Sequence, residues 1–242
     1  MSSLPNTLMS PIEIRASLHG LLTFLFPPGK FSSGEYCAST RTAVTPEFEL
    51  FEHVGAGRAD VEKFISQRFA ESFGSRVEAF MPRLFSLRNR EGDICGAFGL
   101  RSANQKLFLE QYLDTPVNRT ITTCTGSHVE RRSIVEVGHF SGKFPGVVRA
   151  MIGLLTERLH HEGFAWVVFT GTANLRNAFT RMGLSPIDIQ AATVDRLPVE
   201  ERAAWGQYYE HAPRVLIGNI QEGYRAMHRQ ALPDRLRSGS IS

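Results

Sequence analysis

Cysteine is scarce in this sequence, which holds only Cys37, Cys95 and Cys124 among its 242 residues. The number is odd, and none of the three belongs to a C-x-x-C or histidine-rich pattern. This argues against both a disulfide framework and a zinc site, and it is typical of proteins from a reducing compartment. We therefore expect a cytoplasmic chain with no metal site, and the sequence gives no sign of a permanently bound cofactor.

Long apolar runs, blocks of like charge and internal repeats are also missing. No stretch approaches the ~18 apolar residues of a membrane-spanning helix, so we expect no membrane span. The apolar stretch Leu18–Phe26 is followed by Pro27-Pro28-Gly29 and no A-x-A cleavage site, which favours an N-terminal packing helix over a signal peptide. The 27 basic and 24 acidic residues are dispersed and leave a net charge of +3. Nucleic acid is therefore not an expected partner.

What is present is enough apolar sequence for one large domain, at 42% hydrophobic residues. Residues 1–45 and 231–242 are rich in polar and turn-forming residues, and we interpret them as an N-terminal extension and a C-terminal tail. The folded domain is predicted over residues 46–230. The sequence does not indicate an oligomeric state, and a homodimer stays open.

Hydrophobic periodicity within that domain predicts alternating strands and helices, hence an α/β fold. The strands are expected at residues 48–54, 84–88, 94–100, 129–140, 164–170, 187–191 and 214–220. The helices are expected at residues 58–73, 106–113, 147–162, 175–182 and 221–229. Residues 89–93 predict a hairpin turn, and residues 129–170 predict a strand–helix–strand crossover.

The segment Ile134–Ala150 (IVEVGHFSGKFPGVVRA) is the most informative for chemistry. It predicts a strand, a loop over residues 140–146 with closely spaced glycines, and a helix. Such loops let backbone N–H groups and a helix N-terminus meet phosphate oxygens, and Lys143 and Arg149 add positive charge. The glycines lie four apart, which is neither the dinucleotide nor the P-loop spacing. On spacing alone, an ordinary strand–helix connection is an equal alternative.

Five ordered runs resemble the thermostable hemolysin family, and the strand, glycine loop, helix and strand resemble the GNAT acyltransferase core. The five runs are Phe80-Met81-Pro82, FLEQYLD at residues 108–114, IVEVG at residues 134–138, WVVFTGT at residues 166–172 and WGQYYE at residues 205–210. Where the family usually continues with Asn-Leu-Ala, this chain has His139-Phe140-Ser141. The resemblance covers about residues 46–223.

This resemblance implies a GNAT-like central mixed β-sheet flanked by helices, distantly similar to acyl-homoserine-lactone synthases. It implies an N-acyltransferase whose donor is a thioester of coenzyme A or of the phosphopantetheine arm of acyl carrier protein. The acceptor would be the amine of a small or amino-acid-like substrate. Two alternatives stay open: a membrane-active, hemolysin-type protein, and a catalytically silent binding module. The catalytically silent module is suggested by Phe179, which stands where many GNAT enzymes carry a tyrosine that protonates the leaving thiolate.

Acyl transfer needs a base, a polarised thioester and a bound amine, and candidates for each lie near the glycine loop. Glu136 and His139 are the candidate bases, each weighed against a structural role. The candidate donor-binding residues are those around the loop: Val137, Gly138, Ser141, Gly142, Lys143, Gly146, Val147 and Arg149. Glu110 and Asp114, four apart on a predicted helix, would share a face and hold a cationic amine, and Arg132 would reach a carboxylate. For these three, a solvated surface is the alternative.

Overall fold

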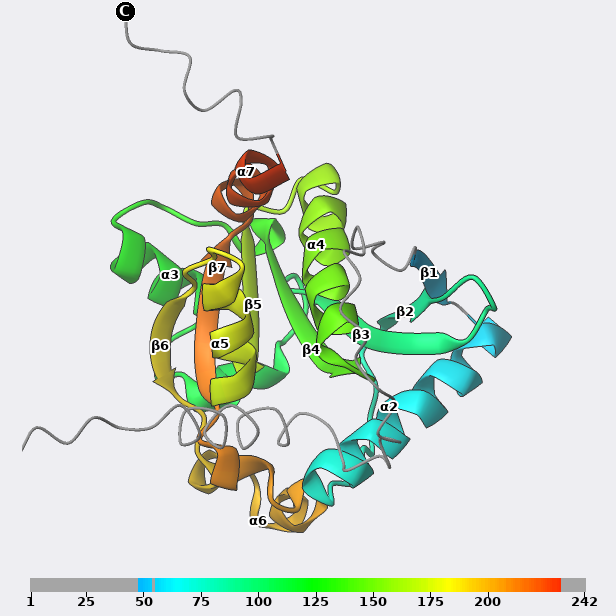
Figure 1. Ribbon diagram of the computed structural model, residues 1–242. Helices are drawn as coiled ribbons and strands as arrows, with labels where there is room; N and C mark the ends of the chain where they lie inside the picture. The colour runs from blue at the N-terminus through cyan, green and yellow to red at the C-terminus, as the bar shows by residue number, and fades with distance from the viewer. Residues whose placement is uncertain (1–47, 54, 232–242) are drawn as a thin grey trace, which may run out of the picture.

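The fold is built on one sheet of seven strands in the order β1-β2-β3-β4-β5-β7-β6 (Figure 1). The computed structural model describes residues 48–53 and 55–231, so the predicted helix over Leu18–Phe26 and the N-terminal extension lie outside the described residues. The strands are β1 (Glu49–His53), β2 (Arg83–Arg88), β3 (Ile94–Ser102), β4 (Ile134–Gly142), β5 (Trp166–Gly171), β6 (Ile187–Ala191) and β7 (Arg214–Asn219). β4 and β5 pair in parallel and the other neighbours are antiparallel. The predicted mixed α/β sheet is confirmed.

Helices cover both faces of the sheet. They are α2 (Ala59–Phe73), α3 (Val117–Thr125), α4 (Pro145–His161), α5 (Ala173–Arg181), α6 (Val199–Arg202) and α7 (Ile220–Ala231). Because strand side chains alternate, Leu84 packs with the buried residues of α2, whereas its neighbour Phe85 packs with those of α4. We call these two sides the α2 face and the α4 face. Helices α5 and α7 pack against α4 on the α4 face.

Two glycines let other elements approach the sheet closely. A side chain on Gly96 would meet the Sδ atom of Met151 at 2.3 Å, so this glycine lets α4 lie directly on β3. A side chain on Gly138 would meet the Cε atom of Met81 at 2.4 Å, on the side of the loop that follows α2. Both close contacts lie beside the part of β4 that no longer pairs with β5.

Two sequence-based boundaries around β4 are wrong. The strand predicted at residues 129–140 begins only at Ile134, because Arg131–Ser133 form a 3₁₀ turn, and it continues to Gly142. The predicted glycine loop over residues 140–146 is therefore only a two-residue connection, Lys143 and Phe144, before α4 begins at Pro145.

The helix predicted over residues 106–113 is also wrong in type. The structure has a short 3₁₀ helix, η2 (Phe108–Tyr112), and the α-helix of this region is α3 (Val117–Thr125), which the sequence analysis missed. The N–H group of Val117, at the start of α3, donates to Glu110 across the turn at Pro116. This connection holds η2 and α3 together against the α2 face of the sheet.

Candidate functional site

The site lies where the two parallel strands at the centre of the sheet separate. β4 and β5 pair from Ile134 and Trp166 as far as Val137 and Phe169, and not beyond. A bulge in β4 lies at the same level, because two of its residues, His139 and Phe140, stand opposite the single residue Phe98 of β3. His139 there has a φ of 55°, a left-handed conformation that is uncommon outside glycine. The bulge turns β4 away from β5 and opens a gap in the sheet.

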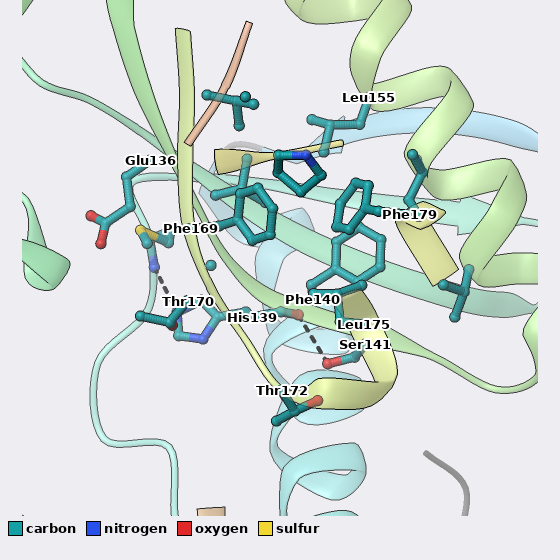
Figure 2. Close-up of a pocket in the computed structure, with 18 of the residues that line it drawn as sticks. Glu136, His139, Phe140, Ser141, Leu155, Phe169, Thr170, Thr172, Leu175 and Phe179 are labelled. Carbon is teal, nitrogen blue, oxygen red and sulfur yellow. Dashed lines mark hydrogen bonds between the residues drawn. The ribbon is translucent and has the colours of Figure 1, made fainter. Parts of the chain in front are cut away.

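A cavity of about 780 Å³ lies at this gap. Such a volume is typical of a site for a small molecule or a cofactor. One part of the lining is apolar and comes mainly from the α4 face; it includes Phe140, Ile152, Leu155, Phe169, Leu175 and Phe179. Figure 2 shows the aromatic rings of this group on one side of the cavity, with Glu136 and His139 toward the other. The cavity therefore joins an apolar region to a polar one.

Glu136 is buried, with 3% of its surface exposed, although it lines the cavity. The N–H groups of Leu109 and Phe108 donate to its two carboxylate oxygens, at 2.8 and 3.0 Å. Burial raises the pKa of Glu136, and these two hydrogen bonds, which stabilise the charged form, oppose the rise. Each oxygen keeps a second lone pair for a ligand. Glu136 thus anchors η2 and remains able to accept a proton.

His139 is held between Phe69 and Phe80, whose ring centroids lie 6.2 and 5.5 Å from the imidazole centroid. The N–H group of Met81 donates to its Nε2 atom at 3.2 Å, so the neutral ring carries its proton on Nδ1. Burial, with smaller effects from the charges of Arg101 and Arg58, lowers the pKa of His139 to about 4. At neutral pH this imidazole is therefore a hydrogen-bond donor through Nδ1, and its free electron pair is already engaged.

The predicted donor-binding residues divide into two groups. Four of them line the cavity: Val137, Gly138, Ser141 and Gly142. The other four, Lys143, Gly146, Val147 and Arg149, do not. Among them Val147 is buried in the core, and the remaining three are exposed at the start of α4. The structure therefore brings together the strand half of the predicted donor segment and leaves the helix half outside the cavity.

The N-terminus of α4 also has fewer free N–H groups than the sequence indicated. Pro145 has none, and the N–H groups of Val147 and Val148 both donate to the carbonyl of Phe144. The N–H group of Lys143 donates to the carbonyl of Cys95. This helix start therefore offers a poorer cradle for a diphosphate than an open glycine loop would.

The predicted acceptor residues lie apart from the cavity. The prediction that Glu110 and Asp114 share a helical face is wrong, because η2 ends at Tyr112 and Asp114 lies beyond it. Glu110 pairs with Arg131 and accepts the N–H groups of Leu107 and Val117, which lowers its pKa against the opposing effect of burial. Asp114 is exposed and pairs with Arg196. Arg132 is exposed beside its ion-pair partner Glu130. The geometry thus gives all three residues other partners.

Several lining residues were not identified from sequence, and Arg101 is the most informative of them. Arg101 pairs in register with Glu136 across β3 and β4, so both side chains lie on the same face. The α4 face holds their neighbours Leu100 and Val137, so Arg101 and Glu136 lie on the α2 face. Only the strand register reveals this pair, and no spacing in the sequence indicates it.

The aromatic residues of the WGQYYE run belong both to the core and to the cavity. Trp205 packs on Phe108 at 5.4 Å between ring centroids, and Trp205 and Tyr208 line the cavity. The hydroxyl group of Tyr208 donates to Thr170 Oγ1 at 3.3 Å. Trp205 and Tyr208 therefore contribute both to the core and to the wall of the cavity.

Within residues 48–53 and 55–231, no group of three or more His, Cys, Asp or Glu side chains is placed to hold a metal ion. None of the helices in the same part of the chain is both long and apolar enough to cross a bilayer.

Comparisons with solved structures show where this fold has been seen before. The chain is similar to TofI in its apo form, with a TM-score of 0.53 and 14% identity over 74% of this chain and 96% of that one. It is similar to the AHL synthase LasI, with a TM-score of 0.50 and 10% identity over 72% and 91%. It is also similar to FeeM, an N-acyl amino acid synthase from uncultured soil microbes, with a TM-score of 0.52 and 13% identity over 78% and 100%. At these identities the likeness shows the fold alone, and it confirms the predicted GNAT-like architecture.

Sequence comparison gives the family. No curated protein matches the chain. The family model described as thermostable hemolysin matches residues 52–224, which is most of the sequence and all of the strands after β1. The chain therefore belongs to the thermostable hemolysin family.

Proposed function

We propose that this chain is an N-acyltransferase that moves an acyl group from a thioester to the amine of a small or amino-acid-like acceptor. The observation that carries the proposal is the cavity between the separated strands β4 and β5, which joins an apolar region to a buried carboxylate. The fold shared with an AHL synthase and an N-acyl amino acid synthase supports it. A cytoplasmic location, expected from the scarcity of cysteine, is part of the same proposal.

The donor would enter between β4 and β5. Beyond Val137 and Phe169 the facing backbone edges no longer pair with each other, so their polar groups are available to an extended pantetheine arm. The acyl chain would lie among Phe140, Leu155 and Phe179, where burial of methylene groups contributes about 0.8 kcal/mol each. The donor is a thioester of coenzyme A or of acyl carrier protein. The few free N–H groups at the start of α4 favour the carrier protein, since a diphosphate finds little support there.

Glu136 would act as the base for the acceptor amine. The ammonium group gives one proton to Glu136, and the free nitrogen then bonds to the thioester carbonyl carbon. The C–S bond breaks, the thiolate leaves and takes up a proton, and the second nitrogen proton is lost. The products are an amide, a thiol and one proton. Phe179 packs on Phe169 within the cavity and has no hydroxyl group, so it cannot supply the thiol proton.

His139 would polarise the thioester carbonyl. Its Nε2 atom is already engaged by Met81, so the ring offers the Nδ1 proton to an oxygen that becomes negative in the transition state. We therefore assign the base role to Glu136 and a donor role to His139. Ser141 is unavailable for the same task because its hydroxyl donates to the carbonyl of His139 at 2.9 Å.

Incubation of the purified protein with dodecanoyl coenzyme A or dodecanoyl acyl carrier protein and a mixture of amines tests the proposal. Thiol release that depends on an amine, together with an amide of matching mass, is the expected result. Absence of any amide with both donors, from protein that unfolds cooperatively and is therefore folded, would favour the catalytically silent binding module.

A further inference from the structure

Arg101 is a cavity-lining guanidinium that has no ionic partner among the residues that the structure describes. It is only partly exposed, and it forms no side-chain hydrogen bond or ion pair there. Glu136, its neighbour in register, is within range of its charge but directs both oxygens at backbone N–H groups. A guanidinium that is partly removed from water and lacks a partner is costly unless a ligand completes it.

Other arginines of the same cavity differ from Arg101 in this respect. Arg68 donates to Glu71 and to the carbonyl of Gly142, and Arg76 donates to Glu78. Their charges are therefore matched within the protein. Arg101 combines three features. It lines the cavity, no charge among the described residues pairs with it, and it lies beside Glu136, the proposed base.

The position of Arg101 points to the acceptor and not to the donor. Arg101 and Glu136 lie on the α2 face of the sheet, whereas the apolar lining proposed for the acyl chain comes from α4 and α5 on the other face. The donor crosses the gap between β4 and β5, and the acceptor amine must approach from the opposite side to reach the carbonyl carbon. A group bound at Arg101 therefore belongs to the molecule that receives the acyl group.

We propose that Arg101 binds the carboxylate of the acceptor, so that the acceptor is an α-amino acid and the product an N-acyl amino acid. This inference rests on the proposed acyl transfer. Paired residues on adjacent strands hold their Cβ atoms about 4.5–5.5 Å apart, so Glu136 and Arg101 present opposite charges side by side. An α-amino acid carries its ammonium and carboxylate groups on one carbon, with the matching charges. The planar guanidinium also suits two parallel hydrogen bonds to a carboxylate.

The test uses product binding, which does not depend on turnover. N-dodecanoylglycine and N-dodecanoylglycinamide differ only in the carboxylate, and calorimetry measures the affinity of each for the protein. Wild type is expected to bind the glycine compound about 10- to 100-fold more tightly, the usual scale for hydrogen bonds to a charged group. R101Q should lose this preference and R101K should keep part of it. R119Q, which removes one exposed arginine outside the cavity, should behave as wild type.

Three outcomes would overturn the inference. Equal affinity of wild type for the two compounds would show that no carboxylate is recognised, and this result needs no variant. A preference that survives in R101Q would place the carboxylate elsewhere. Weaker binding of coenzyme A by R101Q, with the preference intact, would assign Arg101 to the donor. Failure of the proposed function is a separate result. It would appear in the activity assay as absence of thiol release with every amine, and it does not depend on how tightly the protein binds the two N-dodecanoyl compounds.

Discussion

At the scale of single residues, two carboxylates near η2 differ in ways that decide their roles. Glu136 and Glu110 both accept backbone N–H groups near η2, but only Glu136 lines the cavity. Glu110 instead pairs with Arg131. Replacement of each by glutamine therefore separates a loss of stability from a loss of chemistry.

Glu136→Gln should lower turnover by roughly 10²–10⁴-fold, the usual contribution of a general base. It should also lower the free energy of unfolding by about 1–3 kcal/mol. The amide nitrogen of glutamine is a donor, so one backbone N–H group that donated to the carboxylate loses its acceptor. Glu110→Gln should show a similar loss of stability with turnover unchanged at temperatures where the variant is folded. Turnover of Glu136→Gln within about twofold of wild type would remove Glu136 from the reaction.

His139 makes stability depend on pH in a defined direction. Its pKa of about 4 in the folded protein lies below its ordinary value of 6.5, so the unfolded chain binds the proton more readily. The contribution of His139 to the free energy of unfolding is therefore fully present above pH 6.5 and is lost as the pH is lowered toward 4. The full difference corresponds to about 3 kcal/mol, and because the ring borders a cavity that water can enter we expect about 1–2 kcal/mol.

Urea unfolding of wild type and His139→Asn between pH 7 and pH 5 measures this effect. Burial also lowers the pKa of His53, which adds a loss of the same sign to both proteins, so the difference between them isolates His139. Glu162, whose pKa is lowered to about 2 chiefly by its hydrogen bond with Arg83, loses its contribution only below about pH 4.5. Equal pH slopes for the two proteins would contradict the lowered pKa of His139.

At the scale of elements, helix α5 forms a wall of the apolar part of the cavity. Leu175 of α5 lines it, together with Phe179 one turn later, and Asn177 of the same helix is exposed outside the lining. Leu175→Trp should fill part of this space and lower turnover of dodecanoyl donors about 10-fold or more, with acetyl donors little affected. Asn177→Trp introduces the same indole side chain on the solvent side and should leave turnover of both donors unchanged. Equal loss for both chain lengths in Leu175→Trp would place the acyl chain elsewhere.

Elements with strong local periodicity were predicted correctly from the sequence. The hairpin of β2 and β3, helices α2, α4 and α5, and strand β5 all lie within a few residues of their expected positions, and the crossover from β4 through α4 to β5 has the expected order of elements. The apolar residues of α2 and α4 recur at the helical period, so local pattern identifies each of these helices. Strands β2 and β3 are buried on both faces, and they were identified from short apolar runs on either side of the polar turn at residues 89–93.

Residues 106–133 were predicted poorly because distant contacts shape them. Helix α3 offers only Val117 and Ile121 as buried residues, which is too weak a pattern to identify. The 3₁₀ turn before β4 depends on Arg131, which pairs with Glu110 across 21 positions. The candidate site shows the same limit, since Glu136 was identified from its segment whereas Arg101 emerged only with the register of β3 and β4.

At the scale of the whole molecule, the cavity connects the two faces of the sheet. Its lining includes residues of α4, α5 and α7 on one side and of α2 and its following loop on the other. Under the proposed function, a donor and an acceptor would approach from opposite sides and meet at the gap between β4 and β5. The amide product would carry a long apolar chain from one face and a polar head group from the other.

Such a product is an amphiphile, and this bears on the lysis that the family name records. None of the helices in the described part of the chain can cross a bilayer, whereas each methylene group of a free acyl chain adds about 0.8 kcal/mol to membrane binding. We therefore predict that dye-filled phosphatidylcholine vesicles leak only when wild type is supplied with both a dodecanoyl donor and an amine. Glu136→Gln with the same substrates should leave the vesicles intact, since it forms little product. Leakage caused by the pure protein without a donor would instead support the membrane-active alternative, and leakage in proportion to the amide formed would assign lysis to the product.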